Sequence, residues 1–380
     1  MKHRSVVALV SMLAVLVFAF TACAPAATPE VIEKTVVVEE TVMVESEPET
    51  IVVTATPGPQ TGGMSDADAT AVLKGKKLAG ILSGPVNDAG WNTNAYLAMV
   101  NLRDKFGMEI AYTESTKVED AAQVMRDYAE AGYDMILAHG YEYADQIKEV
   151  ALEYPDVTFI QTNGAEGEVA NLYTITFSAG EGGYFIGRLA CEITKTGKVT
   201  LIAGESFPIN DHHLLMMKQA CTDLESDAEI NDVYVGSWVD PAKTKELAKA
   251  AIEQGSDVLI LNADSGDTGG IEAAKEAREA GNTDLRVISW VKDKNHLGPD
   301  FVLGGWAEDV TKEVEYLMRD VIAAGQPGGH FSVGLAEGAV YMNPFYGLVP
   351  AEVENDIVSL EKAYIEDPAA VPNLVVRKDL

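Results

Sequence analysis

Aromatic and polar residues recur at or just after the ends of the β-rich runs of this sequence, where parallel strands would bring their carboxyl ends together. The residues in these positions are Asn87, Asp88, Trp91, His139, Tyr141, Phe207, Trp238, Asp264, Trp290 and Trp306. Flat ring faces with a few carboxylate and amide groups suit a planar, neutral heteroaromatic ligand, held by stacking and by hydrogen bonds at its edge. We expect Trp91 to stack on one face of the ligand and Phe207 or Trp238 on the other. Asn87 and Asp264 would bind its polar edge.

The sequence lacks the motifs that support catalysis or cofactor binding. It contains no G-x-x-x-x-G-K-[ST] phosphate loop, no G-x-G-x-x-G after the first strand and no G-x-S-x-G nucleophile. His212 and His213 could offer metal ligands, but neighbouring residues of a helix point to different faces. We therefore expect a binding protein rather than an enzyme, with no catalytic residues, no metal and no cofactor.

Short β-rich runs alternate with amphipathic helical segments along most of the chain. The runs are Leu78–Leu82, Asp134–Ala138, Val157–Gln161, Leu172–Thr176, Lys198–Ala203, Val233–Trp238, Asp257–Leu261, Arg286–Trp290 and Phe301–Trp306. Most are continuously apolar, which is typical of strands covered on both faces. Asp240 and Pro241 mark the start of one helix, and Gly255 suits its exit. The alternation predicts an α/β fold of doubly wound parallel sheets in two lobes.

The chain begins with the pattern of an export signal. A basic start at residues 2–4, an apolar run over residues 6–20 and small residues before Cys23 are typical of a secretory signal. The end of this segment resembles a lipobox, although a plain transmembrane anchor is the alternative, since about 18 apolar residues can span a bilayer. We predict a lipoprotein signal peptide over 1–22, a lipidated Cys23, and an unfolded acidic tether, rich in Pro, Thr and Val, over 23–73. The protein would then be lipid-anchored on the extracytoplasmic face of the cell membrane.

Charge and cysteine content exclude some partners and leave one question open. The formal net charge of −31 argues against nucleic acid, and against anionic lipid surfaces bound through a basic patch. Besides Cys23, the chain has Cys191 and Cys221, both within helical patterns. Two small buried thiols are the favoured interpretation and a disulfide is the alternative, because pairing cannot be deduced from sequence.

Several motifs resemble those of the basic membrane protein (Bmp) family, which includes lipoproteins similar to purine nucleoside receptor A. The segments that carry the likeness are Gly84–Trp91 (GPVNDAGW), Tyr133–Tyr141 (YDMILAHGY), Tyr154–Val157 (YPDV), Glu181–Tyr184 with Gly187, Gly236–Pro241 (GSWVDP) and Gln254–Val258 (QGSDV). The likeness covers about residues 78–353. It implies a type I periplasmic-binding-protein fold, two doubly wound lobes joined by a three-strand hinge, and a role as the substrate-binding component of an ABC importer.

The resemblance also implies how the lobes divide the chain and what they bind. The N-lobe would comprise 74–177 plus 306–328, and the C-lobe 178–305 plus 329–380. A ligand between the lobes would stabilise the closed form, which the permease recognises. The expected partners are a small heterocycle and ABC permease subunits, with the receptor itself a monomer.

The choice between a purine base and a nucleoside depends on one departure from the family pattern. Nucleoside-binding members carry an Asp after the seventh or eighth strand and a Lys at the next strand end, which hold the ribose. Here those places are interpreted as Trp290 and Trp306, with Lys292 and Asp293 close by. Asp293 is a further candidate for ligand binding, and with a nucleoside Asp293 and Lys292 would replace the usual ribose clamp. A buried ribose without partners would be costly, so a purine base or related heterocycle is preferred to a nucleoside. A nucleoside-hydrolase-like enzyme and a sensory receptor are alternatives of other classes; the receptor is less favoured because no second membrane segment follows as far as Leu380.

Overall fold

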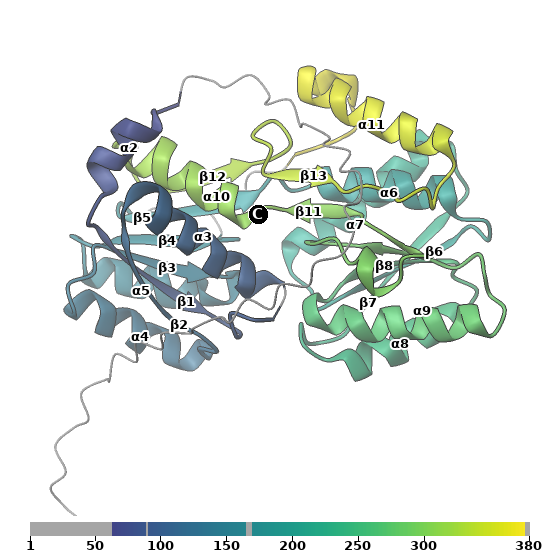
Figure 1. Cartoon of the computed structure of the whole chain (residues 1–380), viewed down its shortest axis with the longest axis horizontal. Coiled ribbons are helices and arrows are strands. Elements are labelled where there is room, and N and C mark those ends of the chain that lie inside the picture. The colour runs from purple at the N-terminus through teal and green to yellow at the C-terminus, as the bar shows by residue number, and fades with distance from the viewer. Residues whose placement is uncertain (1–62, 89, 165–168, 377–380) are drawn as a thin grey trace, which may run out of the picture. The chain divides into compact units, whose positions relative to one another are not determined.

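The computed structural model describes residues 63–88, 90–164 and 169–376, and within them two parallel sheets flanked by helices (Figure 1). The predicted signal peptide 1–22, Cys23 and most of the expected tether lie outside the described residues. Across the described ranges, no helix has both the length and the apolar character needed to cross a membrane.

The first sheet has six parallel strands in the order β12-β5-β4-β3-β1-β2. They are β1 (Lys77–Leu82), β2 (Glu109–Thr113), β3 (Met135–His139), β4 (Thr158–Thr162), β5 (Leu172–Phe177) and β12 (Gly329–Val333). The pairing aligns Leu82 with His139, and His139 with Thr162. This register brings the carboxyl ends of β1, β3 and β4 together at one edge. The edge strand β2 was not predicted from the sequence, because it is partly exposed and lacks a continuous apolar run.

The second sheet has five parallel strands in the order β10-β9-β8-β6-β7. They are β6 (Lys198–Ala203), β7 (Glu229–Tyr234), β8 (Val258–Asn262), β9 (Arg286–Ser289) and β10 (Val302–Leu303). Strands β11 (Trp306–Glu308) and β13 (Val340–Met342) form a separate antiparallel pair. The predicted doubly wound parallel α/β architecture is confirmed.

Helices cover both faces of each sheet and divide the buried side chains into three clusters. The helices are α2 (Asp66–Leu73), α3 (Trp91–Phe106), α4 (Val118–Glu130), α5 (Ala144–Glu153), α6 (Glu181–Ile193), α7 (Pro208–Asp223), α8 (Pro241–Glu253), α9 (Asp267–Glu279), α10 (Val310–Tyr316), which continues as a π-helical turn (Leu317–Ile322), and α11 (Ala351–Glu366). One cluster runs through both lobes beneath α2, α3, α10, α6, α7 and α11. The α4–α5 face and the α8–α9 face each have a smaller core of their own. The two lobes thus share a core on one side and are separate on the other.

Two boundaries differ from the sequence prediction: the end of the tether and one division between the lobes. The tether was expected to reach residue 73, but α2 is folded, with the Ser65 side chain capping its start and Ala69 and Leu73 fully buried. The prediction of an unfolded segment is wrong for the residues of α2, because the side chains of Ala69 and Leu73 pack in the shared core. Residues from 329 were expected in the C-lobe, but β12 pairs with β5 in the first sheet. The chain therefore leaves that sheet only after Val333, and the rest of the domain division stays a prediction.

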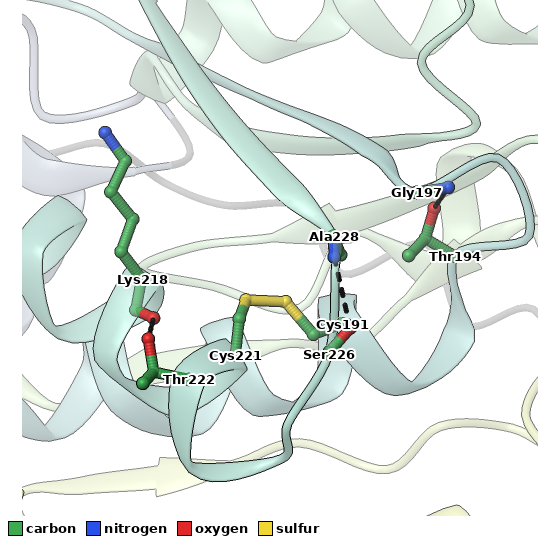
Figure 2. The surroundings of a disulfide bond; sticks show 8 residues. All are labelled: Cys191, Thr194, Gly197, Lys218, Cys221, Thr222, Ser226 and Ala228. Carbon is green, nitrogen blue, oxygen red and sulfur yellow. Dashed lines mark hydrogen bonds between the residues drawn. A yellow bond between two sulfur atoms is a disulfide. The ribbon is translucent and has the colours of Figure 1, made fainter.

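A disulfide joins α6 to α7 and corrects the expectation of two free thiols. Figure 2 shows the bond between Cys191 and Cys221, whose Cα atoms lie 5.6 Å apart. This separation is within the range that a disulfide requires. The two helices pack directly against each other in the shared core, and that tertiary contact brings together cysteines 30 residues apart.

Candidate functional site

The first element of the site is the loop that leads from β1 into α3. The Asp88 carboxylate accepts hydrogen bonds of 2.9–3.0 Å from the backbone N–H groups of Gly90, Asn92 and Thr93. It also accepts bonds of 2.8 Å from the side chains of Asn92 and Thr93. Burial favours the neutral acid, but these hydrogen bonds hold the pKa of Asp88 below its ordinary value. Asp88 therefore binds the first N–H groups of α3 from a position two residues before the N-cap Gly90, and Asn87 beside it is exposed.

Trp91 begins α3 and stacks on His139 at the end of β3. The two ring centroids lie 4.1 Å apart, with 22° between the ring planes. His139 is fully buried, and its ring nitrogens contact Trp91 O at 3.1 Å and Thr162 Oγ1 at 2.7 Å. Burial lowers the pKa of His139 to about 3. Its expected contact with the ligand does not fit this position, because neither the ring nor its nitrogens are accessible.

The C-lobe contributes two half-buried aromatic rings. Phe207 lies at the start of α7, and Trp238 follows β7. Their centroids are 6.3 Å apart and their planes are inclined by 22°. The Trp238 ring lies so close to Gly204 that a side chain on Gly204 would collide with it. Only glycine at that position lets the ring lie against the backbone that follows β6.

Tyr141 brings a third ring to the same place from the other sheet. Its centroid lies 5.5 Å from that of Phe207, with the planes inclined by 46°. Tyr141 follows β3, whereas Phe207 follows β6, so this contact joins the strand ends of the two lobes. The sequence prediction that Tyr141, Phe207 and Trp238 belong to one region agrees with these contacts.

Asp264 makes a polar contact between the lobes. Its carboxylate follows β8, and its two oxygens lie 3.3 and 3.4 Å from Trp91 N, at the start of α3. Gly90 lies directly against this carboxylate and has no room for a side chain. Asp264 is only 8% exposed, and burial, with the Asp88 charge nearby, raises its pKa to about 7. Its charged form is favoured by the helix N-terminus and disfavoured by burial.

Lys292, which the sequence indicated only as a neighbour of Trp290 and a candidate ribose contact, lies close enough to Asp88 and Asp264 for their charges to act on it. It is half-buried after β9, where burial lowers its pKa while Asp88 and Asp264 act to raise it. The neighbouring Lys294 forms an ion pair of 2.5 Å with the fully buried Asp267. A lysine that follows a strand end was the available signal, because neighbouring strand ends had already been assigned to the site.

Asp293 follows Lys292 in the chain and lines a hollow together with it. Its carboxylate accepts hydrogen bonds from Tyr346 Oη and from Asn295 N, the latter at 2.8 Å. Lys292 and Asp293 also line a hollow of about 420 Å³, together with Asn94 on α3 and Glu308 on β11. A role for Asp293 in ligand binding stays a prediction.

Trp290 and Trp306 do not face the cleft, which corrects their expected role. Both are 1% exposed and belong to the shared core. Trp290 Nε1 donates to Glu308 Oε1 at 2.8 Å, and Trp306 stacks on Phe185 at 6.2 Å. The backbone of Gly182 lies against both rings. Position at a strand end does not decide which way a side chain points, and here both rings fill the core beside α6.

The chain matches the model of a family described as Bmp, ABC transporter substrate-binding protein PnrA-like, over residues 76–372. It is 28% identical over 296 residues to the transcriptional activator protein med of Bacillus subtilis, covering 77% of this chain and 90% of that one. It is 25% identical to a purine-binding protein of Brucella abortus, over 71% of this chain and 75% of that one. Identity to the nucleoside-binding protein BmpA of Lactococcus lactis is 24%, over 76% and 86%.

Solved structures show the same fold. A solute-binding protein of an ABC transporter system from Aeropyrum pernix superposes with a TM-score of 0.68 and 20% identity, over 80% of this chain and 94% of that one. The expectation of a type I periplasmic-binding-protein fold is therefore confirmed.

Proposed function

Because this chain belongs to the Bmp family of PnrA-like ABC transporter substrate-binding proteins, we propose that it binds a purine or a related heterocycle between its lobes. The bound ligand would be delivered to an ABC permease. The family consists of substrate-binding proteins rather than enzymes, so the ligand should leave unaltered. In this proposal the protein acts as a monomer, lipidated at Cys23 and anchored outside the cell membrane.

The observation that carries the proposal is a set of aromatic rings that both lobes supply at or beyond the carboxyl ends of their strands. Trp91 from α3 has one face against His139, and Phe207 contacts both Tyr141 and Trp238. A planar heterocycle between Trp91 and the C-lobe rings would gain about 0.5–1.5 kcal/mol from each aromatic pair beyond area burial. The printed names of the purine-binding and nucleoside-binding relatives support this ligand class.

A nucleoside is the second candidate, and one observation favours it. The preference for a free base depended on Trp290 and Trp306 facing the ligand, and both are in the core. Asp264 follows β8 and Lys292 follows β9, and the Asp264 charge acts to raise the pKa of Lys292. This is the Asp and Lys arrangement that the family resemblance connects with ribose. Sugar hydroxyls would therefore find both an acceptor and a donor there.

A role in transcription, suggested by the name of the Bacillus subtilis relative, is less well supported. The net charge of −31 opposes contact with DNA phosphates, which require positively charged side chains. The names of the purine-binding and nucleoside-binding relatives indicate a function that requires no contact with DNA.

Native mass spectrometry of the full chain, purified without refolding, tests the proposal directly. A purine base or nucleoside should be retained at one molecule per chain, and calorimetric titration with adenine, hypoxanthine, adenosine and inosine should identify the tightest ligand. Trp238→Ala should weaken that binding, whereas Tyr112→Ala, on the exposed edge strand β2, should not. Retention of a sugar or a peptide, or conversion of a nucleoside into base and sugar, would contradict the proposal.

Lys292→Met separates the two ligand candidates. If ribose contacts Lys292, the affinity for adenosine should fall at least about tenfold while the affinity for adenine stays unchanged. An equal loss for both ligands would place Lys292 at the base, and no loss for either would remove it from the site.

A further inference from the structure

His139 occupies one face of the Trp91 ring. The two rings are nearly parallel, at 22°, and their centroids are 4.1 Å apart. His139 has no exposed surface, whereas Trp91 is half-buried. One face of the indole is thus covered by imidazole, so only the other face could stack on a ligand.

The hydrogen bonds of His139 define its tautomer. Trp91 O is a carbonyl oxygen and can only accept, so Nε2 carries the proton in the 3.1 Å contact. In the neutral ring Nδ1 must then accept, which makes the Thr162 hydroxyl the donor in the 2.7 Å contact. Burial keeps the ring neutral although the Asp88 charge nearby opposes this. Both nitrogens are used, and neither can bind a ligand or a metal in this arrangement.

We propose that His139, held by Thr162, is a positioning residue that fixes Trp91 so that a single indole face is presented to the ligand. The proposal rests on the function proposed above, because it assumes that Trp91 stacks on the ligand. The imidazole covers the ring and bonds the carbonyl of the same residue, so it restrains both side chain and backbone of Trp91.

A second restraint acts on the backbone of Trp91 from the other lobe. Asp264 accepts from Trp91 N, while His139 donates to Trp91 O. The residue that should stack on the ligand is therefore fixed at both its backbone N–H and its carbonyl group. A ring that is already ordered loses little conformational entropy on binding. Freeing it should weaken binding by about threefold to tenfold, through the cost of immobilising one side chain.

Fluorine NMR of the full chain labelled with 5-fluorotryptophan tests the positioning directly. The chain has four tryptophans, so four resonances are expected, and Trp91→Phe assigns one of them. Thr162→Val removes the donor to Nδ1, and His139→Phe keeps a flat ring but loses both hydrogen bonds. Each should shift or broaden the Trp91 resonance without ligand, while the buried Trp290 and Trp306 resonances stay in place. His139→Gln, whose amide can still donate to Trp91 O, should restore part of the wild-type signal.

His213→Gln is the matched control for loss of a buried imidazole. His213 is also buried, burial likewise lowers its pKa to about 3, and its ring meets Trp290 edge-on at 4.9 Å. This variant should lower stability and shift the Trp290 resonance, but leave Trp91 unchanged. Nitrogen NMR of wild-type His139 should show the Nε2–H tautomer from about pH 5 to about pH 8, with no titration.

Binding of adenine and adenosine completes the test. Thr162→Val should raise the Kd of whichever of them binds by about threefold to tenfold, and His213→Gln should not. If Thr162→Val and His139→Phe lower Tm as His213→Gln does but leave the Trp91 resonance unchanged, His139 is only a packing residue and the inference is wrong. If the Trp91 resonance responds as expected but wild-type protein binds neither purine, the positioning stands and the proposed ligand class fails.

Discussion

Replacing Asp264 by asparagine should stabilise the protein at neutral and alkaline pH while weakening ligand binding. Asp264 is buried against Trp91 N, and burial together with Asp88 raises its pKa from 3.8 to about 7. The unfolded chain releases this proton near pH 3.8, whereas the native protein keeps it until about pH 7. The native state therefore binds more protons within this window, and the free energy of unfolding falls as pH rises through it.

The size of the effect follows from that difference in pKa. About three pH units at about 1.4 kcal/mol each give an upper limit of roughly 4 kcal/mol, reached above pH 7. The asparagine side chain would be neutral at every pH, and its oxygen can still accept from Trp91 N. Asp264→Asn should therefore match the wild type near pH 4 and become progressively more stable than it up to pH 7. The same change should weaken purine binding at least about tenfold if Asp264 bonds the ligand in its charged form.

Urea unfolding of wild type and variant at intervals from pH 4 to pH 8 measures this difference. Other buried carboxyls also titrate, but they are present in both proteins and cancel in the comparison. Asp88→Asn is the control of opposite sign, because the hydrogen bonds to Asp88 lower its pKa. That variant should be less stable than wild type at pH 7, with the gap narrowing below pH 4. A gap between Asp264→Asn and wild type that stays constant from pH 4 to pH 8 would refute the reasoning.

Four further changes test the site, the fold and the anchor. Trp238→Ala should raise the Kd for the retained purine at least about tenfold in calorimetry, with a change in apo Tm much smaller than that of a core variant, because the ring is half-exposed; an unfolded apo protein would make Trp238 a core residue. Replacing Cys191 and Cys221 together by alanine should lower the free energy of unfolding by about 3–4 kcal/mol for a loop of this length, measured in urea without reductant; equal stability would mean that the thiols are not paired. Leu73→Ala should cost about 2–5 kcal/mol, because Leu73 is fully buried, and a neutral result would show that α2 is detached. Cys23→Ser should release the protein from membranes in fractionation, and unchanged retention of a processed, unlipidated chain would contradict the lipid anchor.

Local signals in the sequence were sufficient for much of the fold. Strand β6 begins and ends at the predicted residues, since a continuous apolar run covered on both faces has clear limits. Helix α8 begins at Pro241 with Asp240 capping Lys243 N, as predicted, and Gly255 has the positive φ that suits its exit. Caps and turns depend on residues only a few positions apart, so their physics can be read along the chain.

The direction of side chains and the contacts between distant segments were decided only by the tertiary structure. Trp290 follows β9 and Trp306 begins β11, and both fill the core, whereas Trp238, which follows β7, lies half-buried against Gly204. His139 was correctly placed near the strand ends, but its stacking on Trp91 depends on the register of β1 against β3 and on the start of α3. The Cys191–Cys221 bond likewise depends on how α6 packs on α7. Each of these outcomes is set by packing between segments far apart in sequence, which composition and periodicity do not specify.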